Sequence, residues 1–132
     1  MEFRSIRPED YELVRHFLME VGWRHRVGDP EQFRCMIEKT DRTAVAWDDQ
    51  RIVGFGRALC DGVSNGYISM VAVAADRRGQ GIGRKLVESL IDEVNLTWVL
   101  RADRGSRGFW EKMGFTASSI AMERVRDSGL KQ

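Results

Sequence analysis

The sequence predicts a mixed α and β fold, with a central, mostly antiparallel twisted sheet and helices on both of its faces. Apolar segments joined by short polar turns occupy residues 43–74, which indicates meandering antiparallel strands. One amphipathic segment at 81–94 separates two further apolar segments, and such a strand–helix–strand crossover is parallel and right-handed. The length of 132 residues fits one domain, expected at residues 1–126, with a loose tail at 127–132.

Residues 1–6 are expected to form the first strand, and two helices follow it. Pro8 marks the start of the first helix, because proline suits the first turn and the acids after it suit the helix dipole. Asp29 is the expected N-cap of the second helix, with Pro30 at its first position. The segment 22–28 between them is bounded by glycines and is expected to be a loop. The apolar residues with helical spacing are Leu13, Val14, Phe17 and Leu18, and then Phe33, Met36 and Ile37.

The second half begins with strands and then alternates helix and strand. The clearest helical pattern of the chain lies at 81–94, with apolar residues on one side and charged residues on the other. Strands are expected at 43–47, 51–59, 67–74, 96–102 and 117–125, and a further helix at 106–113. The expected order of elements is therefore β, α, α, β, β, β, α, β, α, β.

The composition argues against several classes of protein. With 21 basic and 20 acidic residues, the net charge of +1 gives no electrostatic case for nucleic-acid binding. The two cysteines, Cys35 and Cys60, form no disulfide framework, and with His16 and His25 they form no zinc-ligand pattern. No apolar segment reaches the roughly 18 residues of a membrane span, and the first residues do not resemble a signal peptide. We therefore expect a cytoplasmic protein without a metal site.

The segment 78–84, Arg-Gly-Gln-Gly-Ile-Gly-Arg, joins the end of a predicted strand to the start of the amphipathic helix. The first backbone N–H groups of a helix have no intrahelical partner, and the helix dipole makes that end positive. Glycines let an anion approach these groups closely, and Arg78 and Arg84 add positive charge beside them. The segment therefore predicts a phosphate-binding site, with a plain tight turn as the simpler alternative.

Two common nucleotide-binding motifs do not fit this spacing. A P-loop needs G-x-x-x-x-G-K-[ST], whereas Arg-Lys-Leu follows Gly83. A dinucleotide-binding loop needs G-x-G-x-x-G, whereas an arginine or a leucine stands at the sixth position counted from Gly79 or Gly81. The expected phosphate therefore belongs to a ligand other than those that P-loops and dinucleotide-binding loops hold.

The motif that fits is R-x-x-G-x-G, and here the sequence resembles the GNAT superfamily of acyl-CoA-dependent N-acetyltransferases. Val71-Ala72-Val73 precedes the motif, where the family has its fourth strand, and the helix at 81–94 follows, where the family has its third helix. The segment 106–115, Ser-Arg-Gly-Phe-Trp-Glu-Lys-Met-Gly-Phe, is similar to a later motif of the family. The order of elements matches from Met1 to about Val125, so the resemblance covers nearly the whole chain.

The resemblance implies a site for acetyl-CoA. The pantetheine arm of the cofactor would run beside Val71–Val73 and bond to their backbone, although strand core is the simpler role of these residues. The Val71 amide would face the thioester carbonyl as an oxyanion donor. With Arg78 at the rim, the pyrophosphate would be held by the backbone amides of Gly79, Gln80, Gly81, Ile82, Gly83 and Arg84.

Two positions of the later part depart from the family pattern. Trp110 stands where the family often has a tyrosine that protonates the leaving thiolate, and an indole cannot supply an acidic proton. A thiol has a pKa of roughly 8.5, so a thiolate leaves without much help. Asp103 stands where an asparagine commonly contacts pantetheine, and it is expected instead to cap the next helix, with Ser106 as the alternative cap.

The general base is a second gap in the pattern. Tyr67 stands where histone-type members have a glutamate, and a phenol with an ordinary pKa of about 10 is a poor base at neutral pH. Asp61, in the preceding turn, is the nearest carboxylate in sequence and could act through water, although an aspartate there is more often a turn residue. Histidines titrate near neutrality, but His16 and His25 are expected at the surface. Asp61 and Tyr67 are therefore the candidate catalytic residues.

The sequence thus predicts an N-acetyltransferase that moves an acetyl group from acetyl-CoA to a primary amine of a small molecule or peptide. The alternative is a non-catalytic acyl-CoA-binding regulatory module, since neither acid nor base is assigned. A nucleic-acid-binding domain is disfavoured by the charge, and no membrane partner is expected. Segment 22–28 is expected to line the acceptor site, where Arg24 and Arg26 favour an acidic acceptor. The oligomeric state is open, with a homodimer as one alternative.

Overall fold

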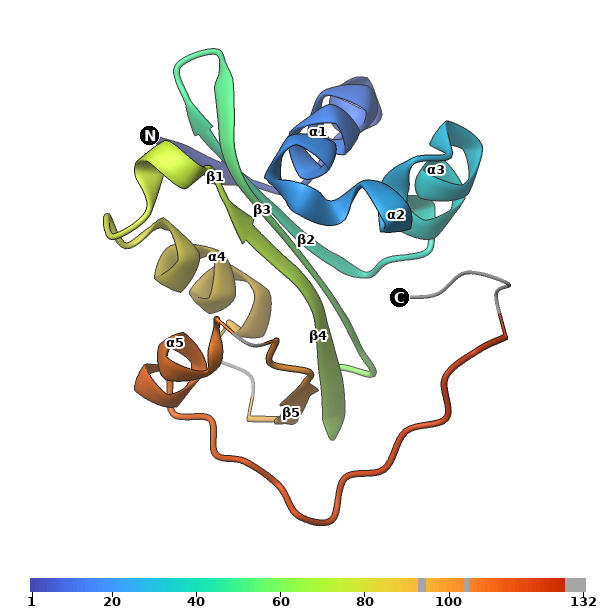
Figure 1. Ribbon diagram of the computed structural model, residues 1–132, viewed down its shortest axis with the longest axis vertical. Helices are drawn as coiled ribbons and strands as arrows, with labels where there is room; N and C mark the ends of the chain where they lie inside the picture. Colours follow the sequence, from blue (N-terminus) through green and yellow to red (C-terminus); the bar gives the residue numbers. More distant parts are fainter. Residues whose placement is uncertain (93–94, 104, 128–132) are drawn as a thin grey trace. The chain divides into compact units, whose positions relative to one another are not determined.

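The computed structural model describes residues 1–92, 95–103 and 105–127 of the chain. The chain divides into two compact units, Met1–Arg101 and Ala102–Gln132. The first unit contains a five-stranded sheet with helices on both faces (Figure 1). The described part of the second unit contains one short helix and a segment without regular secondary structure. The prediction of one domain at residues 1–126 stays a prediction.

The five strands lie in the sheet in the order in which they follow along the chain. Neighbours from β1 to β4 pair antiparallel, whereas β4 and β5 pair parallel across the helix that connects them. This arrangement confirms the predicted mixed fold with its mostly antiparallel sheet and one crossover. The strands are β1 (Glu2–Arg4), β2 (Arg42–Asp48), β3 (Arg51–Cys60), β4 (Asn65–Val73) and β5 (Thr97–Leu100).

The helices form two layers around the sheet of the first unit. Figure 1 shows α1, α2 and α3 on one side of the sheet and α4 on the other. As predicted, Asp29 caps α3: its Oδ1 accepts hydrogen bonds from the backbone N–H groups of Glu31 (3.0 Å) and Gln32 (3.3 Å). The helices are α1 (Tyr11–Leu18), α2 (Arg24–Val27), α3 (Pro30–Glu38) and α4 (Ile82–Ile91), with α5 (Arg107–Lys112) in the second unit.

Helix α4 lies on the face of the sheet to which Gly54 and Gly56 belong. A Cβ atom added at either glycine would lie 2.9 Å from a leucine methyl group of α4, on Leu86 and Leu90 respectively. Glycine at these positions therefore lets the helix pack closely against β3. Both helical layers supply the core, in which the large, fully buried side chains are Val14, Leu18, Val27, Phe33, Val45, Val53, Phe55, Met70, Leu86, Val87 and Leu90.

The segment 22–28, expected to be a loop, is helical instead. The chain passes from α1 through a wide turn at Met19–Trp23, in which Gly22 has a φ of 105°, and then forms α2. Tertiary contacts explain the difference, because Val27 is buried and Arg15 donates hydrogen bonds to the carbonyls of Val27 (3.4 Å) and Gly28 (3.0 Å). Local composition carries no trace of these contacts.

The prediction of a strand at 117–125 is wrong. Within the described residues this segment pairs with no strand. Its apolar side chains are exposed: Ile120 to 87%, Met122 to 97% and Val125 to 62%. A suitable sequence does not make a strand unless a partner edge and an apolar surface are available to it. The predicted end of the long helix at 93–94 and most of the predicted tail, 128–132, lie outside the described residues.

Candidate functional site

The loop between β4 and α4 has the geometry that its glycines predict. Gly79 and Gly81 adopt φ angles of 80° and 83°, in the left-handed region that suits glycine. The first intrahelical hydrogen bond of α4 runs from Lys85 N–H to Gly81 O (3.1 Å), so the amides of residues 82–84 have no acceptor within the helix. A Cβ atom added at Gly79 or Gly81 would meet no heavy atom within 4 Å. The loop therefore offers unpaired amides to an open space.

Two ion pairs fix this loop to the hairpin formed by β2 and β3. Arg51 donates to both carboxylate oxygens of Asp76, at 2.9 and 2.8 Å, and Arg77 pairs with Asp48. The hydrogen bond from Arg51 lowers the pKa of Asp76 below its ordinary value. Exposed pairs of this kind add little to the stability of a fold. Their effect is therefore mainly to position the segment that leads into the glycines.

One edge of β4 is open beside this loop. The described pairing with β5 runs from Asn65 to Ile68 only. Ala74 N–H donates to Val53 O (2.9 Å). Along an antiparallel strand, the peptide groups of successive residues point to opposite edges, so the peptide groups of Ala72 also point to β3. The peptide groups of Val71 and Val73 consequently point to the other edge. The structure thus brings together the predicted strand positions and the predicted glycine loop, which follow each other along one surface.

The predicted rim arginines are exposed at the ends of the loop. Arg78 lies before the glycines, and Arg84 lies in the first turn of α4. The Arg84 guanidinium is 4.0 Å from the carboxylate of Glu88, one turn further along the helix, and both side chains are more than half exposed. Gln80 is also exposed, whereas Ile82 is buried and can contribute only its backbone. The positive charge of the loop therefore comes from amides at the centre and guanidinium groups at the ends.

A polar cluster, of which the sequence analysis named only Arg26 as a candidate for the acceptor site, lies on the face opposite α4. Arg57 of β3 is 7% exposed; its Nε donates to Thr40 Oγ1 (3.1 Å) and its Nη1 to Ser69 Oγ (2.8 Å). Ser69 is the extra residue of a bulge in β4, since Arg57 pairs with Met70 and the next pair skips Ser69. Arg26 of α2 also lies with its Nη2 3.4 Å from Ser69 Oγ. We call Arg57, Ser69, Arg26 and Thr40 the Arg57 cluster.

Tyr67 lies near the Arg57 cluster, whereas Asp61 is occupied in a turn. Tyr67 pairs with Leu59, two residues from Arg57, and therefore lies on the same face of the sheet. Asp61 Oδ1 accepts from the backbone N–H groups of residues 63, 64 and 65, and its Oδ2 accepts from the Ser64 hydroxyl (2.7 Å). These hydrogen bonds, led by those from Ser64, hold the pKa of Asp61 far below its ordinary value. They favour a structural role for Asp61 over the predicted role as a base.

The second unit contains both departures from the family pattern. The Trp110 ring packs edge-on against Phe109 (4.9 Å between centroids) and Phe115 (5.3 Å). The backbone carbonyl of Asp103, rather than its carboxylate, accepts from Ser106 N–H (3.1 Å) and Oγ (3.2 Å). Neither Asp103 nor Ser106 therefore caps α5 with its side chain as predicted. Ser106 occupies the N-cap position, but its side chain accepts no hydrogen bond there.

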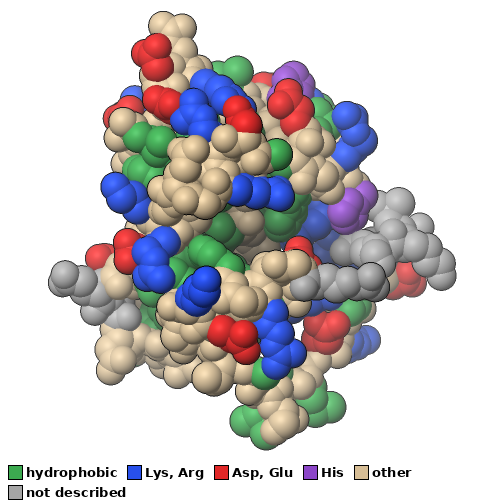
Figure 2. All heavy atoms as spheres, turned by 60° about the vertical axis from the view of Figure 1, so that its left-hand side comes forward, with side chains coloured by type: hydrophobic (Ala, Val, Ile, Leu, Met, Phe, Trp, Pro, Cys, Tyr) green, Lys and Arg blue, Asp and Glu red, His purple; other side chains and the backbone are tan. Residues whose placement is uncertain are grey.

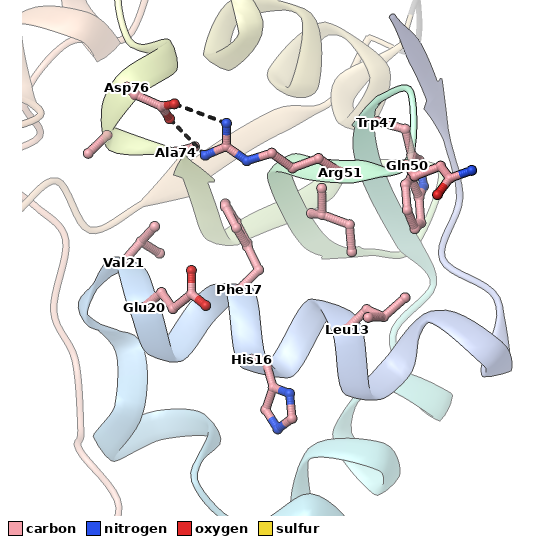
Figure 3. A pocket seen from close by; sticks show the side chains of 12 residues that line it. Leu13, His16, Phe17, Glu20, Val21, Trp47, Gln50, Arg51, Ala74 and Asp76 are labelled. Carbon is pink, nitrogen blue, oxygen red and sulfur yellow. Dashed lines mark hydrogen bonds and ion pairs between the residues drawn. The ribbon is translucent and has the colours of Figure 1, made fainter.

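A separate cleft of about 670 Å³ lies between α1, the β2–β3 hairpin and the end of β4 (Figure 3). Phe17 and the Arg51–Asp76 ion pair line it, as Figure 3 shows. None of its lining residues belongs to the predicted site. The lining residues are Leu13, His16, Phe17, Glu20, Val21, Trp47, Gln50, Arg51, Ile52, Ala74, Ala75 and Asp76.

The surface carries charges of both signs. On the face shown in Figure 2, lysine and arginine side chains alternate with aspartate and glutamate, without a field of one sign. In the described part of the chain, no group of three or more histidine, cysteine, aspartate or glutamate residues could hold a metal ion. No helix among the described residues is both long and apolar enough to cross a membrane.

Comparison with known proteins gives a family. A family model described as an acetyltransferase (GNAT) domain matches residues 10–130. No curated protein matches the chain.

Solved structures share the fold along nearly the whole chain. A protein from Xanthomonas campestris pv. campestris, described as belonging to the GNAT family, is 20% identical, with a TM-score of 0.76 over 96% of this chain and 94% of that one. Glucosamine-6-phosphate N-acetyltransferase from Arabidopsis thaliana is 22% identical, with a TM-score of 0.71 over 96% and 98% of the two chains. Ribosomal-protein-alanine N-acetyltransferase from Brucella melitensis biovar Abortus 2308 is 21% identical, with a TM-score of 0.75 over 96% and 98%.

Proposed function

Because the chain belongs to the GNAT acetyltransferase family, we propose that it moves an acetyl group from acetyl-CoA to a primary amine of a small molecule or peptide. The observation that carries this proposal is the continuity of two features. The open edge of β4 at Val71–Val73 leads directly into unpaired amides at the start of α4. One extended, phosphorylated ligand fits both features at once.

The residues of the first unit fit such a ligand in their chemistry. The amides of residues 79–84 would hold the pyrophosphate of coenzyme A, since unpaired helix N–H groups and the helix dipole both attract anions. Arg78 and Arg84 would add charge at the rim, where they are exposed enough to move toward a phosphate. The peptide groups of Val71 and Val73 would bond to the pantetheine arm, in the way that a strand bonds to its neighbour.

The reaction itself needs a polarised carbonyl and an unprotonated amine. Acetyl-CoA supplies the acetyl group as a thioester when bound. The Val71 N–H, at the open edge, would stabilise negative charge that develops on a carbonyl oxygen placed beside it. The amine must lose a proton, and we propose that water takes it, because the Asp61 carboxylate is too weak a base to draw a proton strongly. Tyr67 stays a candidate for contact with the acceptor, because it faces the α1–α3 side near the bulge.

The acceptor is not set by the fold. One structural neighbour acts, by its name, on glucosamine 6-phosphate and another on the alanine of a ribosomal protein. We propose a small molecule or a peptide with a primary amine, in the cytoplasm, without nucleic acid or membrane as a partner. The near-balanced surface charge supports the absence of a nucleic-acid partner.

Release of free thiol from acetyl-CoA, followed over a panel of primary amines, tests the proposal. Mass spectrometry of each amine identifies the acetylated product. The expected result is amine-dependent thiol release with at least one member of the panel. Binding of coenzyme A without any amine-dependent release would favour the alternative, a non-catalytic acyl-CoA-binding module.

A further inference from the structure

Arg57 is a buried cation whose described partners carry no charge. Its hydrogen bonds go to the hydroxyls of Thr40 and Ser69, which use two of its five N–H donors. No carboxylate among the described residues forms an ion pair with it. The negative charge of Asp41 raises the pKa of Arg57 from a distance, without a hydrogen bond between them. The Asp41 carboxylate accepts instead from Cys60 N–H (3.2 Å). A buried charge without a counter-charge destabilises a fold unless something else neutralises it.

A second cation lies beside it. Arg26 is held in place by the Trp23 ring, with its guanidinium carbon 4.9 Å from the ring centroid, and it approaches Ser69 Oγ at 3.4 Å. Burial lowers the pKa of Arg57, and the positive charge of Arg26 lowers it further, against the opposite effects of Tyr67 and Asp41. Arginine keeps its proton even so. The fold therefore holds two positive charges close together at one point of β4.

The Ser69 hydroxyl between them has one donor left. Its oxygen accepts from both Arg57 and Arg26, which uses its two lone pairs. Its own O–H has no acceptor among the described residues. Arg57 and Ser69 thus both have donors to spare among the described contacts, and neither has an acceptor left. Such a set is complementary to an anionic oxygen group.

The position is accessible and close to the open edge of β4. Arg57 itself is buried, but Ser69 and Arg26 are both partly exposed. Ser69 precedes Val71 by two residues, a span of about 7 Å along a strand. A group bound at Ser69 would therefore lie a few bonds from a group that reacts beside Val71.

We infer that the Arg57 cluster binds an anionic oxygen group, a carboxylate or a phosphate, on the acceptor amine. This inference rests on the proposed function and names the class of acceptor: a small amine with an anionic group a few bonds from its nitrogen. Arg57 and Ser69 determine the specificity, and Arg26 adds charge at the rim. The competing view is that Arg57 only connects the segment after α3 to β4, through the hydroxyls of Thr40 and Ser69.

The experiment compares matched pairs of amines. β-Alanine and 6-aminohexanoate are each paired with the neutral amide of the same length, and 2-aminoethyl phosphate is paired with ethanolamine. The values of kcat and KM are measured for wild type, Arg57→Met, Arg57→Lys and Ser69→Ala. Arg34→Met is the control, because Arg34 is an exposed arginine of α3 paired with Glu31 and Glu38.

Wild type is expected to prefer the anionic member of at least one pair by about tenfold or more in kcat/KM, the scale of one charged hydrogen bond. Arg57→Met should remove that preference mainly through the KM of the anionic amine, with the KM of acetyl-CoA and of the neutral amine nearly unchanged. Arg57→Lys keeps the positive charge but loses the planar set of guanidinium donors, so its preference for the anionic amine should lie between those of wild type and Arg57→Met. The pair that shows the effect distinguishes a carboxylate from a phosphate. Equal kcat/KM values within every pair, or equal preference in wild type and Arg57→Met, would overturn the inference and leave the proposed function standing.

A binding experiment distinguishes failure of the proposed function from failure of the anion site. If no amine is acetylated, the proposed function fails, and calorimetry with glutarate and inorganic phosphate on the protein saturated with coenzyme A decides the anion site alone. Binding that Arg57→Met and Arg57→Lys weaken, and that Arg34→Met does not, supports the site. Absence of binding, or binding that is the same in all variants, overturns it. If Arg57→Met does not fold, Arg57→Lys and Ser69→Ala carry both experiments.

Discussion

Arg15 and Arg57 are buried to nearly the same degree, 6% and 7% exposed, but their surroundings differ in kind. Arg15 meets both carboxylate oxygens of Glu12, each at 2.8 Å, and the carbonyls of Val27 and Gly28. Arg57 donates to two hydroxyls, and a second arginine, Arg26, donates to one of the same hydroxyls. Equal burial therefore does not imply an equal role. A cation whose donors are used by the fold holds the fold together, and a cation with donors to spare is available to a ligand.

The largest expected effect is on Arg15. Arg15→Met removes the donors to the carbonyls at the end of α2, where Val27 is buried, so we expect the free energy of unfolding to fall by about 2–3 kcal/mol. Urea unfolding followed by circular dichroism measures it. Arg15→Lys, which keeps the charge, should recover part of the loss. A fall of less than about 0.5 kcal/mol in Arg15→Met would show that these contacts do not hold α2 in place.

Arg57→Met should have a much smaller effect on stability. Replacement of a buried charge that lacks a counter-charge by an apolar side chain of similar length is often neutral or stabilising. We expect the free energy of unfolding to change by less than about 1 kcal/mol, or to rise, by the same urea measurement. A loss as large as that of Arg15→Met would break the comparison, since it would make Arg57 a structural residue of the same kind.

The two arginines should also differ in their response to acid. The hydrogen bond from Arg15 lowers the pKa of Glu12, so this pair stabilises the fold above the unfolded pKa of glutamate, about 4.3. The stabilisation is lost as the pH falls through the lower pKa of the folded state. Arg15→Met should therefore show a flatter fall in stability below pH about 4.3 than wild type, whereas Arg57→Met should follow wild type. Unfolding midpoints in urea across this range provide the measurement, and parallel curves for Arg15→Met and wild type would contradict the assignment.

The smallest effect is expected at Asp61, which is saturated with hydrogen bonds as Arg15 is. Asn can keep the three backbone hydrogen bonds of the turn, so Asp61→Asn should leave amine turnover within about twofold of wild type from pH about 6 to 10. The pH profile of thiol release tests this. A loss of about tenfold at neutral pH that shrinks as the pH rises would instead restore Asp61 as the base predicted from the sequence.

The glycine loop could be predicted from the sequence because its signals are local. Glycines that need a left-handed φ stand next to the start of the most regular amphipathic helix of the chain, and both facts can be read within one short segment. The Arg57 cluster could not be found in this way. Its members come from α2, the segment after α3, β3 and β4, and Ser69, the extra residue of a bulge, contacts both arginines. The sequence offered two separate signals, Arg26 in the segment expected to line the acceptor site and a charged residue, Arg57, inside the apolar segment of β3, without showing that they lie together.

The two errors in the fold have the same physical origin. The helical turn at 24–27 depends on Arg15, which lies a full element earlier in the chain. The segment 117–125 was expected to be a strand but is exposed and unpaired within the described residues. In the first case a tertiary contact produces a helix that the local sequence does not predict. In the second, the lack of a partner strand leaves a segment irregular although its local sequence predicts a strand.

The claim on which the rest depends is that the loop between β4 and α4 binds coenzyme A through its backbone amides, and a pair of variants at Gly81 tests it most directly. Gly81→Asp and Gly81→Asn impose a similar backbone cost at a φ of 83°, but only aspartate places a negative charge beside the amides. Calorimetry with coenzyme A, on variants shown to be folded by circular dichroism, should give binding at least about a hundredfold weaker for Gly81→Asp than for Gly81→Asn. Equal affinity of the two folded variants for coenzyme A would contradict the assignment of this loop.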